Sequence, residues 1–251
     1  MLIIYRFLIN SVFFLSPIIL IIRLLKKKES LRRFKEKFCF FSKKRGKGKL
    51  LWFHGASVGE IQSIIPLIEK FEKKKEIKKI LITSNTLSSS TIIKKFKFKK
   101  TIHQFFPIDT NGLSKKFLNY WKPSAAFFID SEIWPNTIFN LYKKKIPIII
   151  LNGRITKNTF NKWKKIPKFA KSIFKKINLC FSSSNQSSYY LKNLGVQNIE
   201  FDGNLKFSQS ENEKITIFND LKKFISKRKI WCASSTHKYE EKFCGIVHKE
   251  L

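Results

Sequence analysis

LLWFHGASVGEIQSIIPL, residues 50–67, is the stretch that decides the fold of this chain. It opens with a short apolar run, Leu50 to Phe53, which has the length of a buried strand. Glycine, alanine and serine follow, and these small residues allow a sharp turn and the close approach of another molecule. Isoleucines then recur at helical spacing. The stretch therefore predicts a strand, a tight turn and a helix that begins near Ser57 or Glu60.

The pair Ser57 and Glu60 supports two interpretations. Their S-x-x-E spacing is typical of a capping box, in which Glu60 only caps the helix. The other interpretation places the carboxylate in a glycine-lined crevice between a strand and a helix, where open α/β sheets bind ligands. A carboxylate in such a crevice can act as a general base. The spacing alone does not decide between these roles.

The charge of the chain is extreme, because 51 Lys and Arg stand against 17 Asp and Glu and give a formal net charge of +34. Such a surface favours polyanions, including nucleic acids, anionic lipid head groups and phosphorylated glycolipids. The joint abundance of Lys, Ile, Phe and Asn is what an AT-rich genome imposes, so we attribute most of the charge to composition. No RNA-recognition motif stands out, and we therefore expect no nucleic-acid partner.

The hydrophobic and cysteine contents place the chain among proteins with a packed core and reduced thiols. Hydrophobic residues make up 43% of the 251 residues, which is sufficient for a core. The cysteines lie far apart and none forms a C-x-x-C pair, so we expect neither a disulfide scaffold nor a cysteine metal site. They are Cys39, Cys180, Cys232 and Cys244.

The N-terminal segment is the most hydrophobic part of the chain. Its apolar residues extend from Leu2 to Leu25, and a basic collar follows from Lys26 to Lys37. No small-residue cleavage site follows, so we predict an uncleaved membrane anchor over residues 1–28, with the next domain on the cytoplasmic side. The anchor either spans once or lies in the interface; a buried core helix is less favoured because of the collar.

Strands that alternate with helical segments predict an α/β fold with a Rossmann-like parallel sheet. A basic linker over residues 38–49 precedes this domain, which we place at residues 49–207. The predicted strands cover residues 50–53, 77–83, 101–106, 125–129, 146–151, 179–183 and 199–201. The predicted helices include residues 113–121 and 169–177, and residues 84–90 are expected to form a polar turn.

Polar side chains follow three of the predicted strands. Glu60 comes after the first strand, Asp130 and Glu132 after the fourth, and Arg154 after the fifth. Because the carboxyl ends of parallel strands meet at one edge of a sheet, these residues are expected to form a site there.

Short motifs occur in order along the chain: LWFHGASVGE at 51–60, FFPIDT at 105–110, IDSEIWPN at 129–136, LNGRIT at 151–156, DGNLKF at 202–207 and WCASSTHKYEE at 231–241. In order and spacing they resemble the 3-deoxy-D-manno-octulosonic acid (Kdo) transferases of lipid A and lipopolysaccharide biosynthesis. The resemblance implies a GT-B glycosyltransferase with two Rossmann-like domains across a cleft. Such an enzyme moves Kdo from CMP-Kdo to a lipid A precursor at the cytoplasmic face of the inner membrane, without a metal or cofactor.

The resemblance also implies roles for individual residues. Glu60 matches the general base that deprotonates the acceptor hydroxyl, and Asp130 and Lys206 fall on positions that stabilise the transition state. A cation such as Lys206 suits the negative charge left by departing CMP. For Trp134 a packed turn is an equally good interpretation, and for His237 a capping role is favoured. The candidate substrate-binding residues are Ser57, Gly59, Glu132, Trp134, Asn136, Arg154 and His237.

The chain departs from the family in two ways. The family usually has glutamate at the position of Asp130, whose side chain is one methylene shorter, a change that can weaken catalysis. The chain also ends at Leu251, where the donor domain of the family has only begun. We therefore expect residues 208–251 to form a linker and the start of that domain. The alternative to an enzyme is an acceptor-binding domain, either inactive or completed by a second polypeptide.

Overall fold

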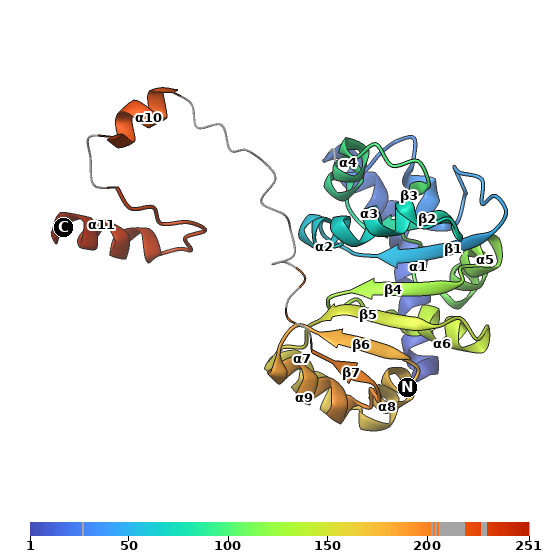
Figure 1. The fold of residues 1–251 in the computed structure, drawn as a ribbon. Coiled ribbons are helices and arrows are strands. Elements are labelled where there is room, and N and C mark those ends of the chain that lie inside the picture. The colour runs from blue at the N-terminus through green and yellow to red at the C-terminus, as the bar shows by residue number, and fades with distance from the viewer. Residues whose placement is uncertain (27, 202, 204, 206–218, 227–229, 251) are drawn as a thin grey trace. The chain divides into compact units, whose positions relative to one another are not determined.

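The computed structural model describes residues 1–251 except 27, 202, 204, 206–218, 227–229 and 251 (Figure 1). It forms two compact units, Met1–Ser210 and Glu211–Leu251. The described part of the second unit contains the helices α10, Asn219–Ser226, and α11, Glu240–Glu250. The predicted domain boundary at residues 207 and 208 lies outside the described residues.

The first unit is built on a parallel sheet, which has seven strands among the described residues, in the order β3-β2-β1-β4-β5-β6-β7 (Figure 1). The fold class predicted from the sequence, α/β with a Rossmann-like parallel sheet, is confirmed. The strands are β1 Lys49–His54, β2 Ile77–Ser84, β3 Thr101–Phe105, β4 Ala125–Ile129, β5 Ile148–Gly153, β6 Leu179–Ser182 and β7 Ile199–Glu200.

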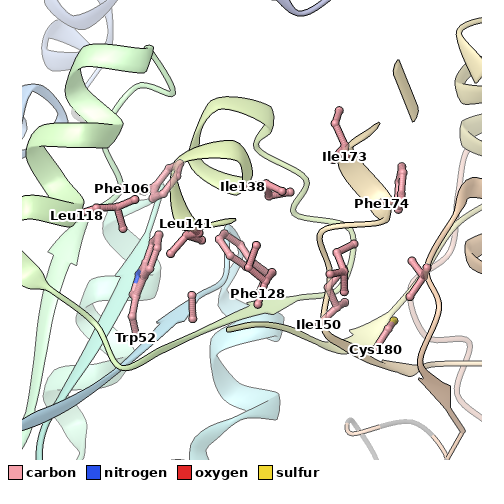
Figure 2. Close-up of a cluster of buried hydrophobic side chains, with 14 of the residues drawn as sticks. Trp52, Phe106, Leu118, Phe128, Ile138, Leu141, Ile150, Ile173, Phe174 and Cys180 are labelled. Atoms are coloured by element: carbon pink, nitrogen blue, oxygen red, sulfur yellow. The ribbon is translucent and has the colours of Figure 1, made fainter. Parts of the chain in front are cut away.

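Two hydrophobic clusters cover the two faces of the sheet, and β1 contributes to both. Trp52 belongs to the larger cluster, in which Phe128 and Ile150 of the sheet meet residues of α5, α6 and α8 (Figure 2). Phe53 belongs to the other cluster, with α2, α3 and α4. This alternation follows from the two-residue period of a strand. The helices are α1 Leu2–Leu25, α2 Val58–Ser63, α3 Ile65–Lys73, α4 Leu87–Lys95, α5 Asn111–Trp121, α6 Pro135–Lys143, α7 Lys157–Lys164, α8 Pro167–Phe174 and α9 Asn185–Leu194, with a 3-10 helix η1 at Phe34–Phe38.

The segment predicted as a basic linker is folded onto the domain. Cys39 is 1% exposed, and the ring of Phe41 stacks on Tyr120 with 3.8 Å between centroids. The Arg45 guanidinium donates to the carbonyls of Trp121 and Lys122. The linker prediction is therefore wrong here, because apolar residues at the start of the segment pack on α5 and Arg45 binds carbonyls at the end of that helix.

Two local predictions after β1 and β2 also differ from the structure. The helix expected after Ser57 is divided into α2 and α3, and α3 begins with Pro66 in its first turn. The polar turn expected at residues 84–90 contains the start of α4 instead. Thr86 is the N-cap of α4, and its hydroxyl accepts from the Ser89 backbone N–H at 3.3 Å. The turn prediction is wrong here because a threonine hydroxyl that caps a helix and the serines that follow it are also typical of turns.

Asp109 joins three separate parts of the first unit. It lies between β3 and α5, is 1% exposed, and accepts hydrogen bonds from the backbone N–H groups of Asn136 and Thr137 at the start of α6. It also accepts from the Thr137 hydroxyl at 2.6 Å and from the Tyr5 hydroxyl of α1 at 2.8 Å. Burial raises the pKa of Asp109 to about 6, and these hydrogen bonds oppose the rise.

We predict that Gly153→Ala lowers the free energy of unfolding by about 1–3 kcal/mol, because overpacking forces the neighbouring side chains to move. An added Cβ would lie 2.7 Å from the Cys180 sulfur and 3.1 Å from Ile150 Cγ2. Urea denaturation followed by circular dichroism measures the loss. Gly112→Ala is the control, because no atom lies within 4 Å of its added Cβ. Equal unfolding midpoints for Gly153→Ala and wild type would contradict the prediction.

The raised pKa of Asp109 predicts a loss of stability as the pH rises from about 4 to about 6. Below this window the carboxyl group is protonated in both folded and unfolded chains; within it, the folded chain holds the proton more tightly. The difference in unfolding free energy between wild type and Asp109→Asn should therefore fall across the window, by at most about 3 kcal/mol.

Urea denaturation of both chains at several pH values measures this difference. Glu76→Gln, at an exposed position, is the control and should show no such trend. A difference for Asp109→Asn that stays flat or rises between about pH 4 and about pH 6 would refute the assignment.

Candidate functional site

The carboxyl ends of β1, β4 and β5 lie side by side at one edge of the sheet. His54, the last residue of β1, pairs with Phe128 of β4, and Ile129 of β4 pairs with Leu151 of β5. The strand order reverses direction between β1 and β4. Such a switch point is where open α/β sheets bind ligands. The segments that follow these strands carry most of the predicted site residues.

Glu60 is held by hydrogen bonds at the turn between β1 and α2. Its Oε2 accepts from the Ala56 backbone N–H at 2.7 Å, and its Oε1 accepts from the Ser57 hydroxyl at 2.8 Å. Ser57 is the N-cap of α2, and its hydroxyl in turn accepts from the Glu60 backbone N–H at 3.3 Å. The capping interaction predicted from the spacing is present, and it fixes the orientation of a half-buried carboxylate.

The two glycines around this turn are in different surroundings. At Gly55 an added Cβ would lie 3.1 Å from Ile61 Cδ1 and 3.2 Å from Glu60 Cβ. At Gly59 an added Cβ would meet no atom within 4 Å. The close approach of Glu60 to the backbone therefore requires glycine at position 55, while Gly59 is exposed and leaves open space beside α2.

Asp130 directly follows β4, and Asn152 is the penultimate residue of β5. Both lie in the left-handed region of backbone space, with φ values of 61° and 56°. The Asp130 backbone N–H donates to the Leu151 carbonyl at 2.9 Å. Asn152 is 3% exposed, and its Oδ1 accepts from the Leu205 backbone N–H at 3.3 Å. Asp and Asn tolerate this conformation better than other non-glycine residues. Such backbone strain often marks a functional site.

Glu132 and Trp134 meet a buried histidine that sequence reasoning missed. The Trp134 indole N–H donates to Glu132 Oε2 at 2.9 Å and lies 3.1 Å from His54 Nε2. His54 Nε2 is 3.2 Å from the same carboxylate oxygen, and His54 Nδ1 is 2.9 Å from the Thr83 hydroxyl. The Trp52 indole N–H donates to that hydroxyl. A histidine that ends an apolar strand beside a glycine turn is the signal that could have identified it.

Asn136 is fully buried, and its side chain binds residues outside this group. Its Nδ2 donates to the Asp109 carbonyl at 2.7 Å, and its Oδ1 accepts from Arg6 Nε at 2.9 Å. In this arrangement the side chain holds α6 to α1 and to the segment before α5. Asn136 could therefore affect a substrate only indirectly, by positioning the start of α6, where Trp134 is the N-cap.

Arg154 is exposed at the end of β5 and lines a hollow of about 330 Å³ with residues that follow β6. Lys157 contributes a second cation to the hollow, and Asn152, Thr156, Ser183, Ser184, Gln186 and Ser187 contribute amide and hydroxyl groups. This hollow lies at the same edge of the sheet as Asp130, and its lining is predominantly polar.

Two predicted site residues are not among the described residues of the first unit. Lys206 is outside the described residues. His237 belongs to the second unit, where its backbone N–H donates to Glu240 Oε2 at 2.6 Å just before α11. Its ring Nδ1 is 3.6 Å from the same oxygen. Glu240 thus binds the backbone N–H of residue 237, and the capping role favoured for the His237 side chain stays a prediction.

Comparison with solved structures supports the fold. A structure described as a UDP-N-acetylglucosamine 2-epimerase from Listeria monocytogenes matches with a TM-score of 0.53, covering 73% of this chain and 53% of that chain. The sequence identity is 14%, so the likeness concerns the fold alone. The first unit is therefore an α/β domain of the GT-B type.

Comparison with protein families is more specific. The model of the 3-deoxy-D-manno-octulosonic-acid transferase (kdotransferase) family matches residues 32–209, and the chain belongs to this family. A Kdo transferase from Rickettsia bellii is 34% identical over 95% of this chain and 58% of its own length. One from Haemophilus influenzae is 26% identical over 80% of this chain and 48% of its own length. The chain thus spans about half the length of these relatives, and the resemblance noted in the motifs is confirmed.

We predict that His54→Leu lowers the free energy of unfolding by about 1–3 kcal/mol, because the Thr83 hydroxyl and the Glu132 carboxylate each lose a polar partner. Thermal and urea denaturation measure the loss. The control is His248→Leu at an exposed position in α11, which should change stability by less than about 0.5 kcal/mol. A wild-type midpoint for His54→Leu would show that the histidine does not support the site.

Proposed function

We propose that the first unit is the acceptor-binding side of a Kdo transferase, which moves Kdo from CMP-Kdo to a lipid A precursor at the cytoplasmic face of the inner membrane. The reaction needs no metal or cofactor in this proposal. Family membership supports the class of reaction. The observation that carries the proposal is the placement of Glu60, whose carboxylate is held by Ala56 and Ser57 beside the switch point of the sheet.

Glu60 is suited to the role of general base. Each carboxylate oxygen has two lone-pair directions, and the described hydrogen bonds use one on each oxygen. The remaining positions can accept a hydrogen bond from an acceptor hydroxyl. As that hydroxyl oxygen bonds to the anomeric carbon of Kdo, Glu60 takes its proton and CMP leaves with the electron pair of the broken C–O bond. Family resemblance assigns Lys206 to the charge on departing CMP and Asp130 to the transition state.

The hollow at Arg154 is suited to an anionic part of the substrates. Arg154 and Lys157 supply positive charge to a lining that also contains Ser183 and Ser184, whose hydroxyls donate to the Gly153 carbonyl and the Ser187 hydroxyl. A guanidinium binds the oxygens of a phosphate in a bidentate geometry. A phosphorylated lipid A precursor provides such a group. We therefore propose that Arg154 binds the acceptor, with Glu132, Trp134, Ser57 and Gly59 nearer to the reacting hydroxyl.

A second candidate function is acceptor binding without transfer. It is favoured by the cationic hollow of the first unit, where Arg154 and Lys157 can hold an anionic group whether or not transfer takes place. In this case the chain would bind the lipid A precursor or the membrane, and a second polypeptide would supply the donor site.

We predict that Glu60→Gln lowers the rate of Kdo transfer by at least about 100-fold, because the amide cannot take the proton of the hydroxyl. The assay follows transfer from CMP-Kdo to a lipid A precursor by the purified chain in detergent, and lipid A precursor binding is measured on the same samples. Glu69→Gln is the control, because Glu69 is exposed on α3; its rate should equal that of wild type.

The outcomes separate the two candidates. Transfer that is lost only in Glu60→Gln supports the enzyme. Binding of the precursor by wild type without any transfer supports the acceptor-binding function. Equal transfer by wild type and Glu60→Gln would refute the role of Glu60, and absence of both binding and transfer would overturn both candidates.

A further inference from the structure

Helix α1 has two unequal faces. A narrow stripe, including Tyr5, Phe13, Ser16 and Leu20, is buried or half-buried against the rest of the first unit. Its members are spaced by three, four or eight residues, so they share one side of the helix. Most of the remaining helix surface is apolar and exposed, although Asn10 is an exposed polar residue. Six residues form an outward line along the opposite side: Ile3 81%, Phe7 71%, Phe14 78%, Ile18 59%, Ile21 57% and Leu25 79% exposed.

The beginning of α1 is tied to the domain by polar contacts. The Tyr5 hydroxyl donates to Asp109 at 2.8 Å. Arg6 donates to Asn136 at 2.9 Å and to Asn111 at 3.3 Å. Asp109 and Asn136 are both buried. These contacts join the first turns of the helix to the starts of α5 and α6.

The middle and the end of α1 are tied as well. The ring of Phe13 packs against Phe38 of η1, with 5.9 Å between centroids. Arg23 donates to Glu29 at 2.7 Å, and Lys37 donates to the same carboxylate. Glu29 is buried, at 7% exposure. The helix therefore runs along the domain from its first turn to its last, and it lies behind the sheet in Figure 1.

By length and composition α1 is able to cross a membrane, but its contacts oppose that orientation. A spanning helix would have to leave the domain, which would deprive buried Asp109 of a donor and carry Arg6 into or across the hydrocarbon. Both changes are costly. A helix that stays on the domain keeps every contact and still presents its outward line to lipid.

The charged groups after α1 indicate which lipids the surface fits. Lys26, Lys28, Arg32 and Lys35 are all exposed, and Leu31 among them is 77% exposed. Exposed cations beside an apolar helix face are attracted to anionic head groups, while the apolar side chains enter the boundary with the acyl chains.

We propose that α1 is an in-plane anchor that lies along the surface of an anionic bilayer, with the outward line inserted and the opposite stripe packed on the domain. This inference rests on the membrane association in the proposed function but not on sugar transfer. It makes the membrane-facing side of the first unit the side that carries α1. A spanning helix would not determine which side of the first unit faces the membrane.

Depth measurements along the outward line distinguish the two orientations. Single cysteines replace Phe7, Phe14 or Ile21 in a Cys232→Ser, Cys244→Ser background, and each carries an environment-sensitive fluorophore. The natural Cys39 and Cys180 are buried, and burial raises the pKa of both thiols to about 12, so they react poorly with the label. Ser88→Cys, at an exposed position in α4, is the matched control.

The labelled full chain is reconstituted into vesicles of phosphatidylethanolamine and phosphatidylglycerol, and lipids brominated at different depths quench the fluorophore. We expect similar shallow depths for the labels at positions 7, 14 and 21, and no quenching at position 88. A helix that spans would place position 14 about 10 Å deeper than positions 7 and 21, because these lie seven residues away at 1.5 Å per residue. That profile would overturn the proposal.

The lipid composition and the sugar transfer assay complete the test. Binding to vesicles of phosphatidylcholine alone should be at least about 10-fold weaker; equal binding would overturn the anionic specificity. Absence of quenching at all positions would overturn insertion of α1. Because the depth profile does not depend on CMP-Kdo, a chain that inserts as expected but transfers no Kdo would contradict the enzyme and not the anchor.

Discussion

The parallel pairing of β1 with β2 on one side and β4 on the other is the constraint on which the first unit depends. The chain first builds the sheet outward from β1 to β3 and then returns to build it from β4 to β7. The helix after β1 therefore packs on one face, in the cluster of Ile61 and Phe53, and the helix after β4 packs on the other, in the cluster of Trp52 and Ile138. Because these two connections leave on opposite faces of the sheet, they leave space at the carboxyl ends of β1 and β4, where Glu60 is placed.

The buried carboxylate of Asp109 determines how the other side of the sheet is assembled. The first N–H groups of a helix have no partner within the helix, and Asp109 accepts from those of Asn136 and Thr137 in α6. The same carboxylate accepts from Tyr5 in α1. One carboxylate thus holds both the apolar helix α1 and the turn that carries Trp134. A shift of α1 would therefore displace the start of α6.

The sheet was largely predictable from the sequence and the connections were less so. Apolar runs such as residues 125–129 predict β4 with its observed bounds, because a strand buried on both faces has few polar residues. The start of α4 was missed because a capping threonine followed by serines is also typical of turns. His54 was missed because its role depends on Thr83 and Glu132, residues distant in the chain. No periodicity within one segment indicates contacts of this kind.

The capping and catalytic interpretations of Glu60 are compatible in this geometry. A general base must be held within reach of the proton that it removes. The N–H of Ala56 and the hydroxyl of Ser57 orient the carboxylate, and Gly55 allows it to lie against the turn. The helix cap therefore supplies the orientation that the proposed base requires. An S-x-x-E pattern after a buried strand is informative because one pair of residues predicts both the start of the helix and an oriented carboxylate.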